Sequence, residues 1–126
     1  PDKTTRRYPW GVDDSGFYEF VMLRILGLQA EDRPWFVAGI TVSTHHPWAV
    51  PHSFQRLFPD LDKYELSFRY ADASLERFYN LLLQHGILDN TLLIISSDEA
   101  NPRMRGEDSF REMLNANHGV LFIRTP

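Results

Sequence analysis

Two clusters of polar residues follow apolar stretches of this sequence, and they hold the side chains that could do chemistry. Residues 43–46 read Ser-Thr-His-His, and residues 96–99 read Ser-Ser-Asp-Glu. Imidazoles and carboxylates that converge without cysteine suit a divalent metal such as Zn²⁺ or Mn²⁺. Such an ion can stabilise charge on a phosphoryl or sulfuryl oxygen while a neighbouring histidine binds the same group.

Each cluster also has a purely structural interpretation. The two histidines before Pro47 could belong to a packed loop with Trp48 as its anchor. The acidic pair at 98–99 could be a solvated turn or could cap the next segment. His118 lies in the run Asn-Ala-Asn-His-Gly at 115–119, where a structural turn explains it as well as a ligand role does. Spacing alone does not choose between these interpretations.

The apolar stretches before the clusters have the character of buried strands. Residues 35–43 (WFVAGITVS) and 91–97 (TLLIISS) are nearly continuous apolar runs, and residues 120–124 form a third. Such runs are typical of strands buried on both faces of a parallel sheet. Ligands of open α/β sheets collect beyond the carboxyl ends of the strands. We therefore expect His45 and Asp98 to lie at one edge of a sheet.

Two helices are expected beside these strands. Asp13 or Asp14 can cap a helix that continues to about residue 28, and the clearest helix runs from about residue 64 to 85 before Gly86. Apolar residues recur at helical spacing in both, at Phe17, Phe20, Val21, Ile25 and Leu28 and then at Phe68, Ala71, Leu75, Phe78 and Leu82. Alternating helices and apolar strands predict a layered α/β/α fold with a mostly parallel sheet.

Composition limits the class of protein. A length of 126 residues allows one domain with a single core, and a net charge of −4 gives no surface suited to nucleic acid. The absence of cysteine excludes disulfides, thiolate metal sites and cysteine nucleophiles. No stretch approaches the roughly 18 apolar residues that a membrane helix needs.

The order of the motifs resembles the sulfatase-like domains of the alkaline-phosphatase superfamily, of the lipoteichoic acid synthase and phosphoglycerol transferase kind. Residues 10–14 (WGVDD) are similar to that family's entry to a helix, and 36–48 (FVAGITVSTHHPW) resemble its strand followed by Thr-Asn-His-x-Pro-Tyr. Residues 70–72 (YAD) resemble its Tyr-x-Asp, and 86–98 (GILDNTLLIISSD) resemble a turn and strand that lead to a metal-binding Asp-His. The resemblance implies that residues 1–126 are the C-terminal part of such a domain.

The resemblance also implies roles for single residues. It makes Asp98 a metal ligand and His45 the histidine that binds substrate phosphate, with Trp48 in place of the aromatic residue after the proline. Glu99 stands where the family has histidine, so it is either an oxygen ligand or the mark of a lost metal site; His118 is a further candidate ligand. Nothing matches the family's nucleophilic threonine, which lies upstream, so we expect the chain alone to be inactive.

The implied activity is that of a membrane-anchored, extracytoplasmic phosphoglycerol or phosphoethanolamine transferase, or a related hydrolase. Its substrate would be a phospholipid or glycan head group, and its cofactor Mn²⁺ or Zn²⁺ at a site that this chain completes only in part. In the resembled mechanism a metal-activated threonine attacks a phosphodiester, and a hydroxyl or water displaces the covalent intermediate. The alternative is a non-catalytic sulfatase-like domain that binds lipid head groups or a partner protein.

Overall fold

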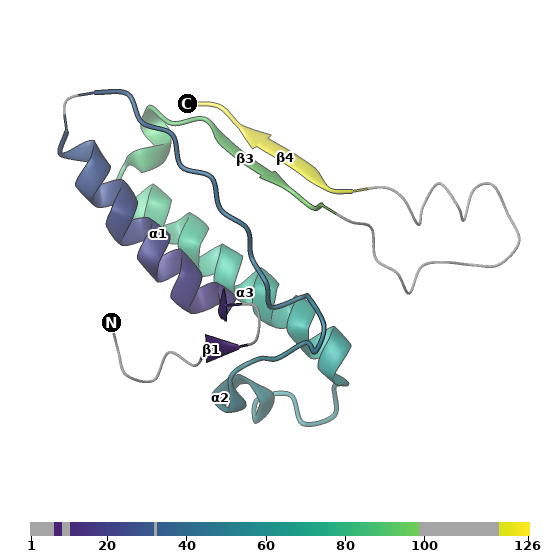
Figure 1. Cartoon of the computed structure of the whole chain (residues 1–126). Helices are drawn as coiled ribbons and strands as arrows, with labels where there is room; N and C mark the ends of the chain where they lie inside the picture. Colours follow the sequence, from purple (N-terminus) through teal and green to yellow (C-terminus); the bar gives the residue numbers. More distant parts are fainter. Residues whose placement is uncertain (1–6, 9–10, 32, 99–118) are drawn as a thin grey trace, which may run out of the picture. The chain divides into compact units, whose positions relative to one another are not determined.

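The computed structural model describes residues 7–8, 11–31, 33–98 and 119–126, which belong to two compact units. The first unit, Pro1–His85, contains the short antiparallel strands β1 (Arg7–Tyr8) and β2 (Gly11–Val12) and the helices α1 (Asp14–Gln29), α2 (His52–Gln55) and α3 (Lys63–Gln84). The second unit, Gly86–Pro126, contains a 3₁₀ turn (Ile87–Asp89) and the strands β3 (Leu93–Ser96) and β4 (Leu121–Arg124) (Figure 1).

Helix α1 begins where the sequence predicts. Asp13 has extended backbone angles, and its carboxylate accepts a hydrogen bond from the Gly16 amide at 3.2 Å, which satisfies one of the unpaired first-turn donors. Ile25 is buried as expected, together with Met22, but Phe20 is 68% exposed, so the expected apolar face is only partly right. The helix carries apolar residues on more than one side, and helical spacing alone does not show which side is covered.

Helix α3 also forms close to the predicted residues. Asp62 caps it by accepting a hydrogen bond from the Glu65 amide at 2.9 Å, and Gly86 follows it in the left-handed conformation that commonly ends helices. The predicted burial of Phe78 and Leu82 is confirmed, whereas Phe68 is 40% exposed and does not belong to the core. The buried side of α3 instead consists of Tyr64, Leu66, Ser67, Tyr70, Ser74, Phe78 and Leu82.

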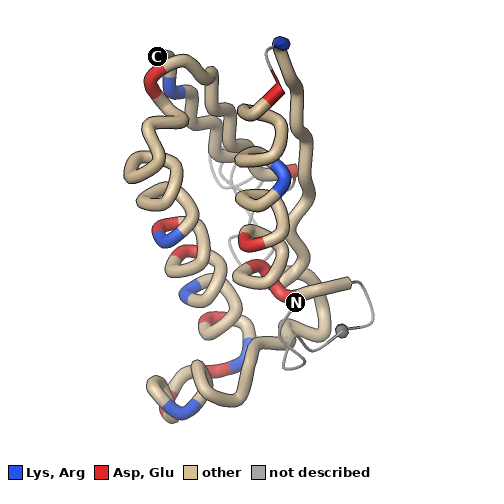
Figure 2. The backbone as a smooth tube through the Cα atoms, turned by 90° about the vertical axis from the view of Figure 1, so that its left-hand side faces the viewer, with Lys and Arg blue, Asp and Glu red and all other residues tan. Residues whose placement is uncertain are grey.

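The two long helices pack side by side (Figures 1 and 2). The Tyr18 ring of α1 stacks on the Phe78 ring of α3 with centroids 4.6 Å apart and planes 15° apart. An exposed ion pair joins Glu19 to Arg77 at 3.4 Å, and basic and acidic positions are interspersed along α3 (Figure 2). Because the ion pair is exposed to water, the stacked rings contribute more to holding the helices together.

The strand predicted at residues 36–43 is not formed among the described residues. This segment runs back along α1 without a ladder partner (Figure 1), and Phe36 is 88% exposed. A continuous apolar run forms a strand only when a neighbouring strand supplies hydrogen bonds, and no described segment does so here. Gly39 lies so close to α1 that a Cβ added to it would overlap the Phe17 ring.

The sheet of the second unit corrects a second expectation. β3 and β4 pair in antiparallel directions, from Leu93 opposite Arg124 to Ser96 opposite Leu121. These two predicted strands are therefore neighbours in one sheet, as expected, but their direction is antiparallel and not the parallel one that the predicted sheet implied. The expected burial of both faces is not observed either, since Ile94 is 56% exposed and Ile123 is 55% exposed, and an apolar run carries no information about strand direction. The mixture of helices and strands is as predicted, and the described part of the chain shows no mostly parallel sheet.

Candidate functional site

The first polar cluster forms two consecutive tight turns. The His45 amide donates to the Val42 carbonyl at 3.0 Å, and the Trp48 amide donates to the His45 carbonyl at 2.8 Å. The peptide bond between His46 and Pro47 is cis, and Trp48 has a left-handed backbone with φ of 56°. A bulky residue in that conformation stores about 1–3 kcal/mol of strain, which persists only where surrounding contacts impose it.

One of those contacts is aromatic. The Trp48 ring meets the Tyr64 ring edge to face with centroids 5.6 Å apart, and Tyr64 is buried in the first turn of α3. The His46 ring also contacts the Trp48 ring, with centroids 5.0 Å apart and planes nearly perpendicular. Trp48 is thus the anchor that the structural interpretation expected, while His45 and His46 remain exposed. The end of the turn is fastened to α3.

The beginning of the turn is fastened to α1 by a buried carboxylate. One oxygen of Asp14, Oδ1, accepts hydrogen bonds from the amides of Val42 at 3.0 Å and Ser43 at 2.9 Å. In return the Asp14 amide donates to the Ser43 hydroxyl oxygen at 3.1 Å. Asp14 is 1% exposed and Ser43 is 3% exposed, so these bonds are shielded from water. Hydrogen bonds to a carboxylate are among the stronger ones in proteins.

The adjacent carboxylate has different partners. Asp13 accepts a hydrogen bond from the Tyr70 hydroxyl at 2.5 Å in addition to capping α1. Burial, and then this hydrogen bond, raise the pKa of Tyr70 far above its ordinary value. Burial and the negative charge of Asp14 raise the pKa of Tyr18 from 10.0 to about 12. Both phenols therefore keep their protons at neutral pH, and Tyr70 acts as a donor that ties α3 to the start of α1.

The ring of His45 has a defined proton at one nitrogen. Its Nδ1 lies 2.8 Å from the carbonyl oxygen of His46. A carbonyl oxygen only accepts hydrogen bonds, so Nδ1 must carry a proton and donate. This contact orients an exposed imidazole on a turn that is fastened at both ends. An imidazole that carries protons on both nitrogens donates from each, which suits the oxygens of a phosphate or sulfate.

The second polar cluster is described only in part. Asp98 is exposed and follows the end of β3, whereas Glu99 and His118 lie outside the described residues. Within the described ranges, no group of three or more histidine, cysteine or acidic residues could hold a metal ion. His45 and Asp98 belong to different units, so their expected proximity stays a prediction.

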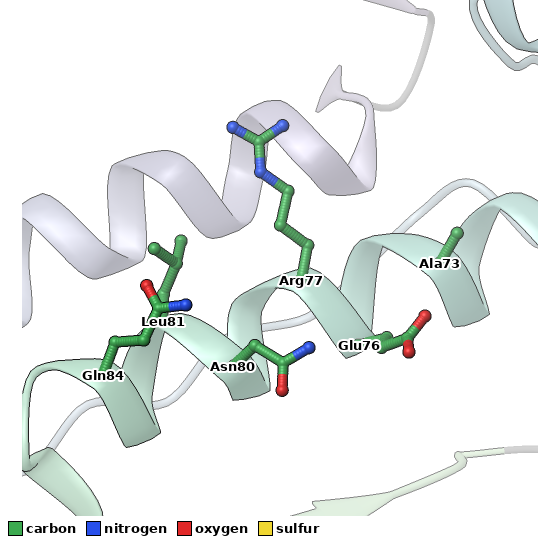
Figure 3. A pocket seen from close by; sticks show the side chains of 6 residues that line it. All are labelled: Ala73, Glu76, Arg77, Asn80, Leu81 and Gln84. Carbon is green, nitrogen blue, oxygen red and sulfur yellow. The ribbon is translucent and has the colours of Figure 1, made fainter.

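A shallow surface hollow lies on one side of α3 and is a weaker candidate (Figure 3). It is lined by Ala73, Glu76, Arg77, Asn80, Leu81 and Gln84. The Arg77 side chain reaches toward α1, while Glu76 and Asn80 point away from it (Figure 3). All but one of these residues are exposed, and Arg77 already pairs with Glu19. The hollow therefore offers no enclosed set of groups for catalysis.

The sequence did not reveal how Asp14 and Ser43 support the turn. It indicated either Asp13 or Asp14 as a helix cap, and the structure gives that role to Asp13. The contact between Asp14 and Ser43 spans 29 residues, so no local pattern marks it. The sequence offered one signal of this contact. A helix needs a single capping residue, and here a second aspartate follows the first.

No helix among the described residues has the length and apolar character needed to cross a membrane. This finding concerns only residues 7–8, 11–31, 33–98 and 119–126.

Comparisons with known proteins agree with the family resemblance. Lipoteichoic acid synthase 2 of Bacillus subtilis (strain 168) is 25% identical over 130 residues, which cover 91% of this chain and 19% of that protein. Lipoteichoic acid synthase-like YvgJ of the same organism is 23% identical over 128 residues, covering 93% and 20%. The chain thus spans about a fifth of the length of these curated relatives, and no solved structure matches it significantly. Because the model of the sulfatase family matches residues 1–125, the chain belongs to the sulfatase family.

Proposed function

We propose that this chain is part of a metal-dependent transferase or hydrolase that acts on phosphodiester or sulfate ester groups of cell-envelope substrates. Membership of the sulfatase family and the similarity to one protein named lipoteichoic acid synthase and one named lipoteichoic acid synthase-like support a phosphoglycerol or phosphoethanolamine transferase. The observation that carries the proposal is the turn at residues 45–48, which contacts of Asp14 in α1 and Tyr64 in α3 hold in place. This turn presents the exposed imidazole of His45.

In this proposal His45 binds the phosphate of a phospholipid or glycan head group. A fixed turn suits this role because a side chain that is already ordered loses less conformational freedom when it binds a ligand. Trp48 lies half-buried beside it and would contact the rest of the head group. No nucleophile is assigned among the 126 residues, so the chain by itself is expected to leave a chromogenic phosphodiester intact.

Asp98 is the proposed contribution to a metal site. Its exposed carboxylate offers the oxygen donors that Mn²⁺ and Zn²⁺ accept, and Glu99 and His118 are proposed as further ligands. A bound ion would stabilise negative charge on the oxygens of the transferred group. In the complete protein we place the domain on the extracytoplasmic face of a membrane, held by an anchor, as the resemblance to the lipoteichoic acid synthase kind implies.

The head-group role of His45 can be tested by titrating the isotope-labelled chain with glycerol 1-phosphate and following its resonances. Replacing His45→Ala should weaken binding at least about tenfold, the equivalent of one lost charge-assisted contact. His52→Ala is the matched control, because His52 is also exposed and bonds only to Gln55 among the contacts described for its ring. Equal affinities of the two variants, or no binding by the unmodified chain, would overturn the proposal. Free glycerol and a sulfate monoester show which group is recognised.

A non-catalytic domain that binds head groups or a partner protein is the second candidate. The observation that favours it is Glu99, which stands where the resembled family has a metal-binding histidine. The complete protein separates the two candidates. Turnover of a phosphodiester that is lost when an upstream threonine or serine at a strand-to-helix turn is replaced by alanine supports the enzyme. Head-group binding without any turnover supports the second candidate.

A further inference from the structure

We propose that Asp14 is a positioning residue for substrate binding, which acts by holding the backbone from which the His45 turn is built. The inference rests on the proposed function of His45 and adds a residue that does not itself touch the substrate. Its basis is the pair of hydrogen bonds that Asp14 Oδ1 accepts from the amides of Val42 and Ser43.

A continuous chain of hydrogen bonds leads from this carboxylate to the turn. Asp14 holds the Val42 amide, the Val42 carbonyl accepts from the His45 amide, and the His45 carbonyl accepts from the Trp48 amide. The Val42 carbonyl shares a peptide unit with the Ser43 amide, which Asp14 also holds, and His45 takes part in both of the bonds that follow. If the carboxylate is removed, the buried Ser43 amide and the partly buried Val42 amide lose their acceptor, and the backbone must move to find water. The residue that moves with it is His45.

The position of Asp14 suits a permanent anchor. It is the first residue of α1, and a negative charge is stabilised near the N-terminus of a helix. Its side chain is almost fully buried, so water does not compete for the two amides. The strained backbone of Trp48 requires such support, because the conformation is unfavourable unless contacts on both sides impose it.

Asp13 provides a matched comparison within the same turn of helix. It is also a buried aspartate, but its carboxylate serves the Gly16 amide and the Tyr70 hydroxyl and holds no amide of the turn. Replacing Asp13→Ser removes the carboxylate and keeps a residue type that caps helices well. Both carboxylates support the fold, but only Asp14 is inferred to support binding.

The experiment measures the affinity of the full 126-residue chain for glycerol 1-phosphate and, separately, its urea unfolding midpoint. Asp14→Ala should raise the dissociation constant about tenfold or more, whereas Asp13→Ser should change it by less than about threefold. Asp14→Asn should bind within about threefold of the unmodified chain, because the amide oxygen can accept both hydrogen bonds in place of Oδ1. Leu82→Ala, a buried change in the last turn of α3, controls for loss of stability alone.

The outcomes separate this inference from the proposed function. If the unmodified chain binds and Asp14→Ala binds equally well, the positioning role is wrong while the role of His45 stands. If Leu82→Ala weakens binding as much as Asp14→Ala does, stability explains the effect and the inference is overturned. If neither the unmodified chain nor any variant binds, the proposed function fails and the inference fails with it. If Asp14→Ala does not fold, Asp14→Glu decides, because it moves the carboxylate by one methylene: weaker binding than Asp14→Asn supports the inference, and equal binding refutes it.

Discussion

Ser43 and Ser97 each belong to one of the two polar clusters, yet their surroundings differ. Each hydroxyl oxygen accepts a hydrogen bond from a backbone amide, that of Asp14 at 3.1 Å for Ser43 and that of Val120 at 2.8 Å for Ser97. Ser43 is buried and Ser97 is exposed. If either bond is lost, water can replace it at Ser97 but not at Ser43. Similar sequences and similar bonds therefore make unequal contributions to stability.

The difference extends to the whole of each cluster. The turn at 45–48 is fastened to two helices by buried contacts from residues distant in the sequence, chiefly Asp14 and Tyr64. The described part of the other cluster continues from an antiparallel ladder, and its Asp98 faces solvent. Within its own unit, the first cluster therefore has buried support for its turn, whereas the described part of the second cluster ends in an exposed carboxylate.

The largest effect is expected from the core on which the first cluster depends. Phe78 is 7% exposed and stacks on Tyr18, so Phe78→Ala should lower the free energy of unfolding by about 3–5 kcal/mol. Leu83→Ala, on an exposed position of the same helix, should change it by less than about 1 kcal/mol. Urea unfolding followed by circular dichroism measures both. Similar losses for the two variants would show that α1 and α3 are not held by this contact.

The comparison itself is tested by replacing the two serines. Ser43→Ala leaves the buried Asp14 amide without an acceptor and should lower the free energy of unfolding by about 1–3 kcal/mol. Ser97→Ala exposes the Val120 amide to water and should change it by no more than about 0.5 kcal/mol. The same unfolding assay applies. A loss at Ser97 as large as that at Ser43 would contradict the comparison.

The smallest expected effect is a loss of stability at alkaline pH, which is absent at neutral pH. The pKa of Tyr18 is raised from 10.0 to about 12, so the folded state keeps a phenol proton that the unfolded state has released above pH 10. The contribution of Tyr18 to stability is therefore complete below pH 10 and is lost as the pH rises through 12. The melting temperature should fall over this interval, and less steeply in Tyr18→Phe. If the phenolate absorbance of Tyr18 appeared near pH 10, its burial between the helices would be in doubt.

The helices could be predicted because their signals are local. The cap at Asp13 and the apolar spacing through Phe78 and Leu82 depend on neighbours within a few residues, and both helices form close to the expected bounds. Phe68 was assigned to the core wrongly because helical spacing gives a face and not its exact centre. The buried Ser67 beside it is satisfied by its own helix, through a bond of 2.7 Å to the Tyr64 carbonyl.

The strands and the supporting contacts could not be predicted in the same way. Strand formation depends on a partner, and residues 36–43 have none among the described residues despite their strong β character. Strand direction likewise depends on topology, which an apolar run does not encode. The residues of the His45 turn could be picked from the sequence as a polar loop, but its support by Asp14 is a contact across 28 and 29 residues.

Gly39 has a consequence for how this segment tolerates change. The residue is exposed to solvent, and exposed positions usually accept substitution freely. Here even alanine must displace the Phe17 ring, because the added Cβ would occupy the same space. The effect on stability of a substitution at position 39 should therefore depend on the residue at position 17. A smaller side chain at 17 should restore the stability that a larger one at 39 removes. Substitutions at these two positions, which are 22 residues apart in the sequence, would then have non-additive effects.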